Sequence, residues 1–283
     1  MLSKRFLILI IIISPVSICH AQSASDAFLM AKRWYEERNY SLAILEARRA
    51  LFFDEFIRLP GYILLSDCYM QMELYDEAIK YLSLAAELES NDSLKNELMF
   101  RKINLYLRNK EPAYALIELQ KVNDIRSGYS AAKRDFYSAL AYYQINDFRL
   151  SETYTNMLLS SSGEYDSCNV RTLFRKARRN YSRSSVFPSV ASAVLPGAGQ
   201  LSEGYFGEAA NSFLLNAMIG CITYITFKQV RALDAILTMY PLVRRYYLSS
   251  IFKAGELSNE KKERRKIELY NELLDFINHQ INN

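Results

Sequence analysis

The sequence predicts an all-α protein, a solenoid of about four helix pairs followed by a C-terminal helical region that associates with a membrane. Half of the 283 residues are hydrophobic, but only 9 are Gly and 6 are Pro, whereas a strand-rich fold would need more of both for its turns. Small and aromatic residues recur about every 36 residues between positions 25 and 160, which indicates stacked repeats. Between residues 186 and 227 the chain is apolar and nearly uncharged, as is typical of a segment that meets lipid.

Residues 1–21 have the pattern of a secretory signal peptide. Two basic residues, Lys4 and Arg5, precede an apolar run, and small side chains at Cys19 and Ala21 provide a cleavage site. An uncleaved membrane anchor and a lipoprotein modified at Cys19 are the alternatives. The apolar run is shorter than the roughly 20 residues of a spanning helix. We therefore expect cleavage and export to the periplasm or cell envelope of a bacterium.

The mature chain would keep three cysteines, Cys68, Cys168 and Cys221, and one histidine, His279. An odd number of scattered cysteines is no disulfide framework, and one histidine cannot build a His–Cys metal cluster or a buried Ser-His-Asp triad. We predict no catalytic residues, no metal site and no cofactor. Without the two basic residues of the signal peptide, the formal charge of +4 falls to about +2, which gives no indication of nucleic-acid binding.

Residues 22–162 hold the repeats. The second helix of each repeat carries a small residue, at separations of 35, 37 and 36: Ala43, Ala78, Ala115 and Ser151. Nine residues before each lies an aromatic residue of the first helix: Trp34, Tyr69, Tyr106 and Tyr142. We expect the ring to pack over the small side chain, so that two antiparallel helices approach closely. Tight turns are expected within each pair, at residues 38–39, 73–74, 109–110 and 146–147.

This pattern resembles the tetratricopeptide repeat family over nearly half of the chain. The match is clearest in the first two repeats, at Ala31, Lys32, Arg33, Trp34, Tyr40, Ala43 and Ala50, and at Tyr69, Tyr75, Asp76, Glu77, Ala78, Ile79 and Ala85. The glycine that the family usually has early in the first helix is replaced in every repeat, and the closing proline is absent. The resemblance implies that the first helices line a concave surface.

Three side chains of each first helix are expected to face that surface. They are Phe28, Lys32, Tyr35, Ile63, Asp67, Met70, Phe100, Asn104, Leu107, Phe136, Leu140 and Tyr143. Most are apolar or aromatic, which suits a helix or an extended peptide of a partner protein and gives no indication of a small-molecule substrate. The same side chains would also suit self-packing, in which a later segment of this chain fills the groove. The sequence leaves both interpretations open.

Residues 163–185 are predicted to form a basic connector helix. Spacings of three and four place Arg171, Arg175, Arg178 and Arg179 on one side of this helix. Beside an apolar segment, such a cluster is typical of contact with anionic lipid headgroups, at about 1 kcal/mol per basic residue. Nucleic acid and a plain solvated capping helix are the alternatives, and export argues against the first.

Residues 186–255 are predicted to be a membrane-associated region. Between residues 186 and 227 the only charged residues are Glu203 and Glu208. A short apolar segment is broken near residue 196, and residues 209–227 are about long enough to cross a bilayer. The next apolar segment, residues 235–252, contains Arg244, Arg245 and Pro241, and its relation to the membrane is ambiguous from sequence.

The break itself resembles a family of bacterial membrane hairpin domains marked by a Leu-Pro-Gly-x-Gly-Gln box. The matching residues of the box are Pro196, Gly197, Gly199 and Gln200. The resemblance implies membrane residence and no reaction or cofactor. We expect Gln200 to satisfy backbone groups freed by the break. A phosphate-binding loop is rejected because no Lys-Ser/Thr pair follows and no strand precedes.

Residues 256–283 are predicted to form a separate amphipathic helix, with Leu269, Leu273, Leu274 and Ile277 at helical spacing. Together the segments predict a non-enzymatic envelope scaffold or adaptor, which binds a partner protein through its repeats and docks to a membrane by its C-terminal region. The alternative is an accessory subunit of an envelope transport or secretion assembly, in which Asn211, Asn216 and Arg244 would contact other helices.

Overall fold

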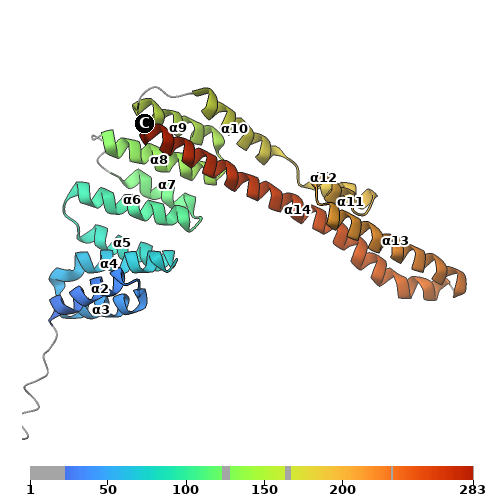
Figure 1. Ribbon diagram of the computed structural model, residues 1–283, viewed down its shortest axis with the longest axis horizontal. Helices are drawn as coiled ribbons and strands as arrows, with labels where there is room; N and C mark the ends of the chain where they lie inside the picture. The colour runs from blue at the N-terminus through green and yellow to red at the C-terminus, as the bar shows by residue number, and fades with distance from the viewer. Residues whose placement is uncertain (1–22, 123–127, 163–166, 231, 283) are drawn as a thin grey trace, which may run out of the picture. The chain divides into compact units, whose positions relative to one another are not determined.

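The computed structural model describes residues 23–122, 128–162, 167–230 and 232–282 (Figure 1). Within these ranges 89% of the residues are helical, in thirteen α-helices, and no strand is present. The predicted all-α class is therefore confirmed. Internal contacts divide the chain into two units, one up to Leu158 and one from Leu159. The expected signal peptide, residues 1–21, lies outside the described residues.

The first unit is a succession of helices that pack on one another in chain order. Pairs α2·α3, α4·α5 and α6·α7 are in contact, and α3·α4, α5·α6 and α7·α8 join one pair to the next. A short 3-10 helix, η2 (Glu55–Ile57), connects α3 and α4. The helices are α2 (Ala24–Glu36), α3 (Tyr40–Phe53), α4 (Arg58–Gln71), α5 (Tyr75–Leu88), α6 (Asp92–Arg108), α7 (Pro112–Lys121), α8 (Gly128–Gln144) and α9 (Phe148–Ser162), the last running past the boundary between the units.

The same turn closes the first helix of each pair. In each turn one non-glycine residue has a positive φ of 59–66°: Arg38, Glu73, Lys110 and Asn146. The amide of the next residue donates to a carbonyl five residues back, at 2.8–2.9 Å, and that carbonyl belongs in turn to Trp34, Tyr69, Tyr106 and Tyr142. This is the bond that caps a helix end when a residue adopts the left-handed conformation. The turns thus lie where the sequence predicts them, and the aromatic residues supply their acceptors.

The small residues of the second helices lie in closed packing sites. Ala43, Ala78, Ala115 and Ser151 are all fully buried. Ser151 replaces alanine without an unpaired hydroxyl, because its Oγ donates to the Ala139 carbonyl at 2.7 Å. The aromatic rings of the first helices stack on rings of the second helices, with centroids 5.5–5.6 Å apart in the pairs Tyr69–Tyr81, Tyr106–Tyr114 and Tyr142–Tyr154. Small and large residues therefore alternate across each helix pair, as close packing requires.

The second unit begins with the basic helix α10 (Ser167–Ser182), followed by the short helices α11 (Val186–Val194) and α12 (Ala198–Glu203). Helix α13 (Phe206–Gln229) then runs beside the first part of α14 (Ala232–Asn282), as Figure 1 shows. Helices α10, α11 and α12 also pack on α14, which is therefore the common support of this unit.

The C-terminal helix differs from the prediction. The expected separate helix at residues 256–283 is the second half of α14, which runs for 51 residues without a break, or about 76 Å at 1.5 Å per residue. Gly255 does not end the helix, since a lone glycine costs a helix only about 1 kcal/mol. Pro241 also lies inside α14. Of the described helices, α13 alone is long and apolar enough to cross a membrane by length and composition.

We expect Ala115→Leu to lower the stability of the repeat unit by about 1–3 kcal/mol, because added methyl groups overpack a fully buried site. Ala113→Leu, an exposed position on the same helix, is the matched control and should change the stability little. Thermal unfolding of the full-length chain in mild detergent, followed by circular dichroism, measures both. Equal unfolding midpoints for the two variants would contradict the packing described.

Candidate functional site

The second unit has an inverted polarity in the part made by α11, α12, α13 and the first half of α14. Its buried side chains include polar and charged ones: Ser192, Gln200, Glu203, Ser250 and Ser258. Large apolar side chains cover its outside instead: Val186, Phe187, Val190, Val194, Leu195, Leu201, Phe206, Phe213, Leu214, Met218, Ile222, Ile225, Phe227, Leu233, Ile236, Leu237, Leu242, Val243, Leu248 and Phe252. An apolar surface of this extent on a soluble protein marks an interaction site for protein or membrane.

A buried amide connects the helices of this region. The Gln200 Nε2 donates to the Ser250 carbonyl at 3.0 Å and to the Ser212 Oγ at 3.2 Å. Its Oε1 accepts a bond of 2.9 Å from the Ser192 Oγ, which in turn accepts from the Gly199 amide at 3.0 Å. Gln200 thus satisfies a carbonyl of α14, while Ser192 satisfies the amide freed at the break. We expected Gln200 to satisfy the backbone groups freed at the break, whereas Ser192 accepts from the Gly199 amide there and Gln200 bonds to α14.

The glycines of the box are required by close backbone contacts. Gly197 has a φ of +95°, and a Cβ there would lie 2.5 Å from the Ala209 carbonyl oxygen. A Cβ on Gly199 would lie 1.9 Å from the Pro188 carbonyl oxygen, well inside van der Waals contact. Pro196 precedes this turn and is partly buried. The box therefore lets α11 and α12 approach each other more closely than any side chain would allow.

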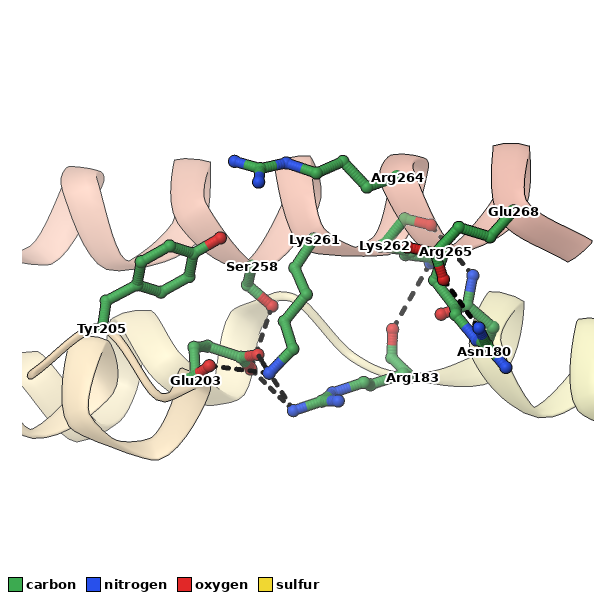
Figure 2. Close-up of a pocket in the computed structure, with 10 residues that line it drawn as sticks. All are labelled: Asn180, Arg183, Glu203, Tyr205, Ser258, Lys261, Lys262, Arg264, Arg265 and Glu268. Carbon is green, nitrogen blue, oxygen red and sulfur yellow. Dashed lines mark hydrogen bonds and ion pairs between the residues drawn. The ribbon is translucent and has the colours of Figure 1, made fainter.

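A buried carboxylate lies at the end of α12. Two bonds of 2.9 and 3.0 Å run from the Arg183 Nη2 to the two oxygens of Glu203, and the Ser258 hydroxyl donates to Oε1 at 3.3 Å. The Lys261 ammonium donates to the Glu203 carbonyl at 2.6 Å and lies 3.4 Å from its carboxylate. Figure 2 shows Arg183, just after the end of α10, and Lys261, on α14, converging on Glu203. This cluster was not predicted from the sequence. The signal that could have indicated it is Glu203, one of two acidic residues in an apolar stretch.

The basic helix α10 places its charges as predicted from spacing. Arg171, Arg175, Arg178 and Arg179 are exposed. The opposite face consists of buried side chains: Val170, Leu173, Phe174 and Ala177. An exposed basic face with an apolar anchor behind it is suited to anionic surfaces.

The predicted groove residues do not form one uniformly open surface. Lys32 is exposed, and the other positions of the first two repeats are partly buried: Phe28, Tyr35, Ile63, Asp67 and Met70. In the later repeats Asn104 and Phe136 are partly buried, while four are buried: Phe100, Leu107, Leu140 and Tyr143. The accessible part of the predicted groove therefore lies in the first two repeats.

Burial changes the titration of side chains in the second repeat. It raises the pKa of Asp67 above its usual value, although the neighbouring Arg101, which hydrogen-bonds to Asp67, acts in the opposite direction. Burial, and the nearby Asp67 carboxylate, raise the pKa of the Cys68 thiol to about 12. A thiol that is protonated at neutral pH is a poor nucleophile, so Cys68 behaves as a small apolar core residue.

Among the described residues no group of three or more His, Cys, Asp or Glu side chains is arranged to hold a metal ion. Comparison of the chain with protein-family models, with curated proteins and with solved structures finds no significant match. The site is therefore interpreted from its own geometry.

We expect Gly199→Ala to destabilise the second unit by about 3 kcal/mol, since the added methyl would overlap the Pro188 carbonyl. Gly207→Ala is the matched control, because a Cβ there meets nothing within 4 Å. Limited trypsin digestion of the full chain in mild detergent measures the loss as faster cleavage after residue 170. If both variants are cut at the wild-type rate, the close contact at Gly199 has no structural role.

Proposed function

We propose that this protein is a membrane-anchored, non-enzymatic adaptor of the bacterial cell envelope. Its helix pairs form a tetratricopeptide-like solenoid that binds a partner protein, and its C-terminal hairpin of α13 and α14 holds the solenoid at a membrane. The single observation that carries the proposal is the inverted polarity of the second unit, with buried polar side chains beneath an exposed apolar surface. Export of the solenoid follows from the expected signal peptide.

Energetics favour a lipid environment for this hairpin. Each exposed large apolar side chain would gain about 1.5–3 kcal/mol on leaving water, and more than a dozen of them cover α13 and the first half of α14. The 24 residues of α13 extend about 36 Å, enough for a hydrocarbon core of about 30 Å. The amides and hydroxyls inside the unit bond to one another, which is how polar groups persist in lipid.

In this proposal the first half of α14 lies in the membrane beside α13. Its two arginines lie between the centre and the surface of the bilayer. Arg244 and Arg245 are exposed and would cost about 2.5–3.5 kcal/mol each at the bilayer centre. The Arg245 guanidinium lies 6.0 Å from the Tyr246 ring, and Tyr240 is also exposed nearby. Long basic side chains reach toward headgroups and tyrosines favour the interface, so this part of α14 is proposed to tilt toward one surface of the membrane.

Partner binding is proposed for the accessible end of the solenoid. The four identical capping turns and the buried small residues support a tetratricopeptide-like stack. Within it, Phe28, Tyr35, Ile63 and Met70 are apolar yet only partly buried, and the Lys32 ammonium lies 4.7 Å from the Phe28 ring centroid. A partner helix or extended segment with apolar side chains and an acidic residue matches this surface.

A second candidate is an accessory subunit of an envelope transport or secretion assembly. It is favoured by the exposure of Asn211 and Arg244 within the apolar surface. Polar side chains that face lipid are costly and usually contact other membrane helices. The Asn216 Nδ2 donates to the Ser212 carbonyl of the same helix at 2.8 Å, and in this candidate function its remaining polar atoms would contact a neighbouring helix.

The membrane proposal predicts opposite effects for two similar substitutions. Ile225 and Ile267 are 52% and 59% exposed, on α13 and on the charged half of α14. Ile225→Arg should increase the fraction of the protein that is extracted from membranes at alkaline pH, because an arginine in the hydrocarbon costs about 2.5–3.5 kcal/mol. Ile267→Arg should leave it membrane-bound. Carbonate extraction of cell membranes measures both, and equal behaviour of the two variants would exclude insertion of α13.

A photo-crosslinking amino acid placed at Ile63 or Met70 should give one discrete adduct with another protein in native membranes, because these side chains line the accessible part of the groove. The same amino acid at Lys80, which is exposed on the second helix of the same pair, is the control and should give none. Mass spectrometry of the adducts identifies the attached peptide. Adducts only with this chain's own later segments would favour self-packing and overturn the partner-binding proposal.

A further inference from the structure

The Glu203 cluster forms the floor of a cationic cleft between the end of α10, the end of α12 and the second half of α14. The cleft has a volume of about 450 Å³, within the ~300–1,000 Å³ of ordinary ligand pockets. Five of the residues that line it are cationic and two carry carboxylates. The lining residues are Asn180, Arg183, Glu203, Tyr205, Ser258, Lys261, Lys262, Arg264, Arg265 and Glu268. The excess of positive charge in a concave site favours an anionic ligand.

Glu203 holds two of these cations in position. Its side chain is only 2% exposed, whereas those of Arg183 and Lys261 are 50% and 44% exposed. Both bonds from Arg183 to the carboxylate come from Nη2, which leaves its other guanidinium nitrogens available to a ligand. One carboxylate cannot neutralise two cations, so a net positive charge stays at the floor.

The walls of the cleft add further donors. The Lys262 ammonium lies 4.9 Å from the Tyr181 ring centroid and donates to the Arg183 carbonyl at 3.3 Å, with no carboxylate partner within the described ranges. The Asn180 Nδ2 donates to the Lys262 carbonyl at 2.9 Å and so fixes α10 against α14. In Figure 2 the Tyr205 hydroxyl points toward the side of the cleft formed by α14.

The position of the cleft indicates the source of the anion. Leu201 and Phe206 lie two and three residues from Glu203 in sequence and are 53% and 72% exposed, so the apolar surface reaches the cleft floor. Lys261 follows Phe252, an exposed apolar residue of α14, by nine residues, or about 14 Å along the helix. Along α10 the lining continues into a second concave surface with Lys176 and Arg179. Charged donors thus begin where the apolar surface ends, at the level of lipid headgroups.

We propose that this cleft binds a phosphate group, supplied by the headgroup of an anionic phospholipid or by a soluble phosphate compound. Arg183, Lys261 and Lys262 donate to the phosphate oxygens in a charge-assisted manner. Glu203 is a positioning residue that limits the affinity, because it competes with the ligand for Arg183 and Lys261. The lipid source rests on the proposed membrane anchoring, whereas phosphate binding itself does not.

The test uses the full-length protein in phosphatidylcholine nanodiscs, to which phosphatidylglycerol or inorganic phosphate is added. Native mass spectrometry counts retained phosphatidylglycerol, and isothermal calorimetry measures phosphate. Lys262→Gln should weaken binding about fivefold, the order expected for one cation near a headgroup. Arg175→Gln, which removes an equivalent exposed charge on α10 outside the cleft, should change binding less than twofold.

Glu203→Gln gives an effect of opposite sign. The amide keeps the shape of the side chain and releases Arg183 and Lys261, so anion binding should become several-fold tighter. Weaker or unchanged binding in Glu203→Gln, an equal loss in Lys262→Gln and in Arg175→Gln, or no binding of either probe would each overturn the proposal. Retention of the lipid without phosphate binding assigns the source to the headgroup, and the reverse assigns it to a soluble compound. Phosphate binding that persists while α13 proves not to insert would leave the cleft valid and refute the membrane anchor alone.

Discussion

The hydrogen bonds of one buried amide determine how the C-terminal unit is assembled. Gln200 contacts Ser192 of α11, Ser212 of α13 and Ser250 of α14, so that four helices share one polar centre. Such a network contributes most where water is excluded, because an unpaired partner would then have no substitute. The close approach at Gly199 brings the network together, and the single turn of helix that follows places Glu203 at the floor of the cationic cleft.

The two units differ in the kinds of side chain that they bury and expose. In the repeats, aliphatic and aromatic side chains are buried around small residues such as Ala43 and Ala78, and the driving force is the removal of apolar surface from water. In the part of the second unit made by α11, α12, α13 and the first half of α14, serine, glutamine and glutamate are among the buried residues, and most of the large apolar residues are exposed. Both arrangements exist in one chain, which is consistent with a protein that works at the boundary between water and lipid.

Much of the first unit is predictable from the sequence because its signals are local. A turn with a left-handed residue, an aromatic residue nine positions before a small one, and helical spacing all act within about 36 residues, and the turns at Arg38, Glu73, Lys110 and Asn146 appear where they are expected. Accessibility of the groove was less predictable. Phe100 and Tyr143 have the same pattern as Phe28 and Tyr35, yet they are buried, because burial depends on contacts that periodicity within one repeat does not contain.

In the second unit the sequence predicts the elements better than their connections. The box and the length of α13 are apparent from composition, but the continuity of α14 through Gly255 depends on its packing against several helices. The partners of Glu203 in this cluster are 20, 55 and 58 positions away from it in the sequence. No local sequence pattern predicts contacts over such separations. The only trace of the cluster was a carboxylate in an apolar stretch, which needs a partner when buried.

Fluorescence quenching at Cys221 measures whether α13 lies in lipid or in water. This cysteine is exposed on α13, and a polarity-sensitive dye can be attached to it in a variant where the other cysteines are replaced by serine or alanine. In reconstituted vesicles we expect strong quenching by brominated acyl chains and little quenching by aqueous iodide, because α13 would lie among the acyl chains. Efficient quenching by iodide, with no effect of the brominated lipid, would show that α13 lies in water and contradict the membrane anchor.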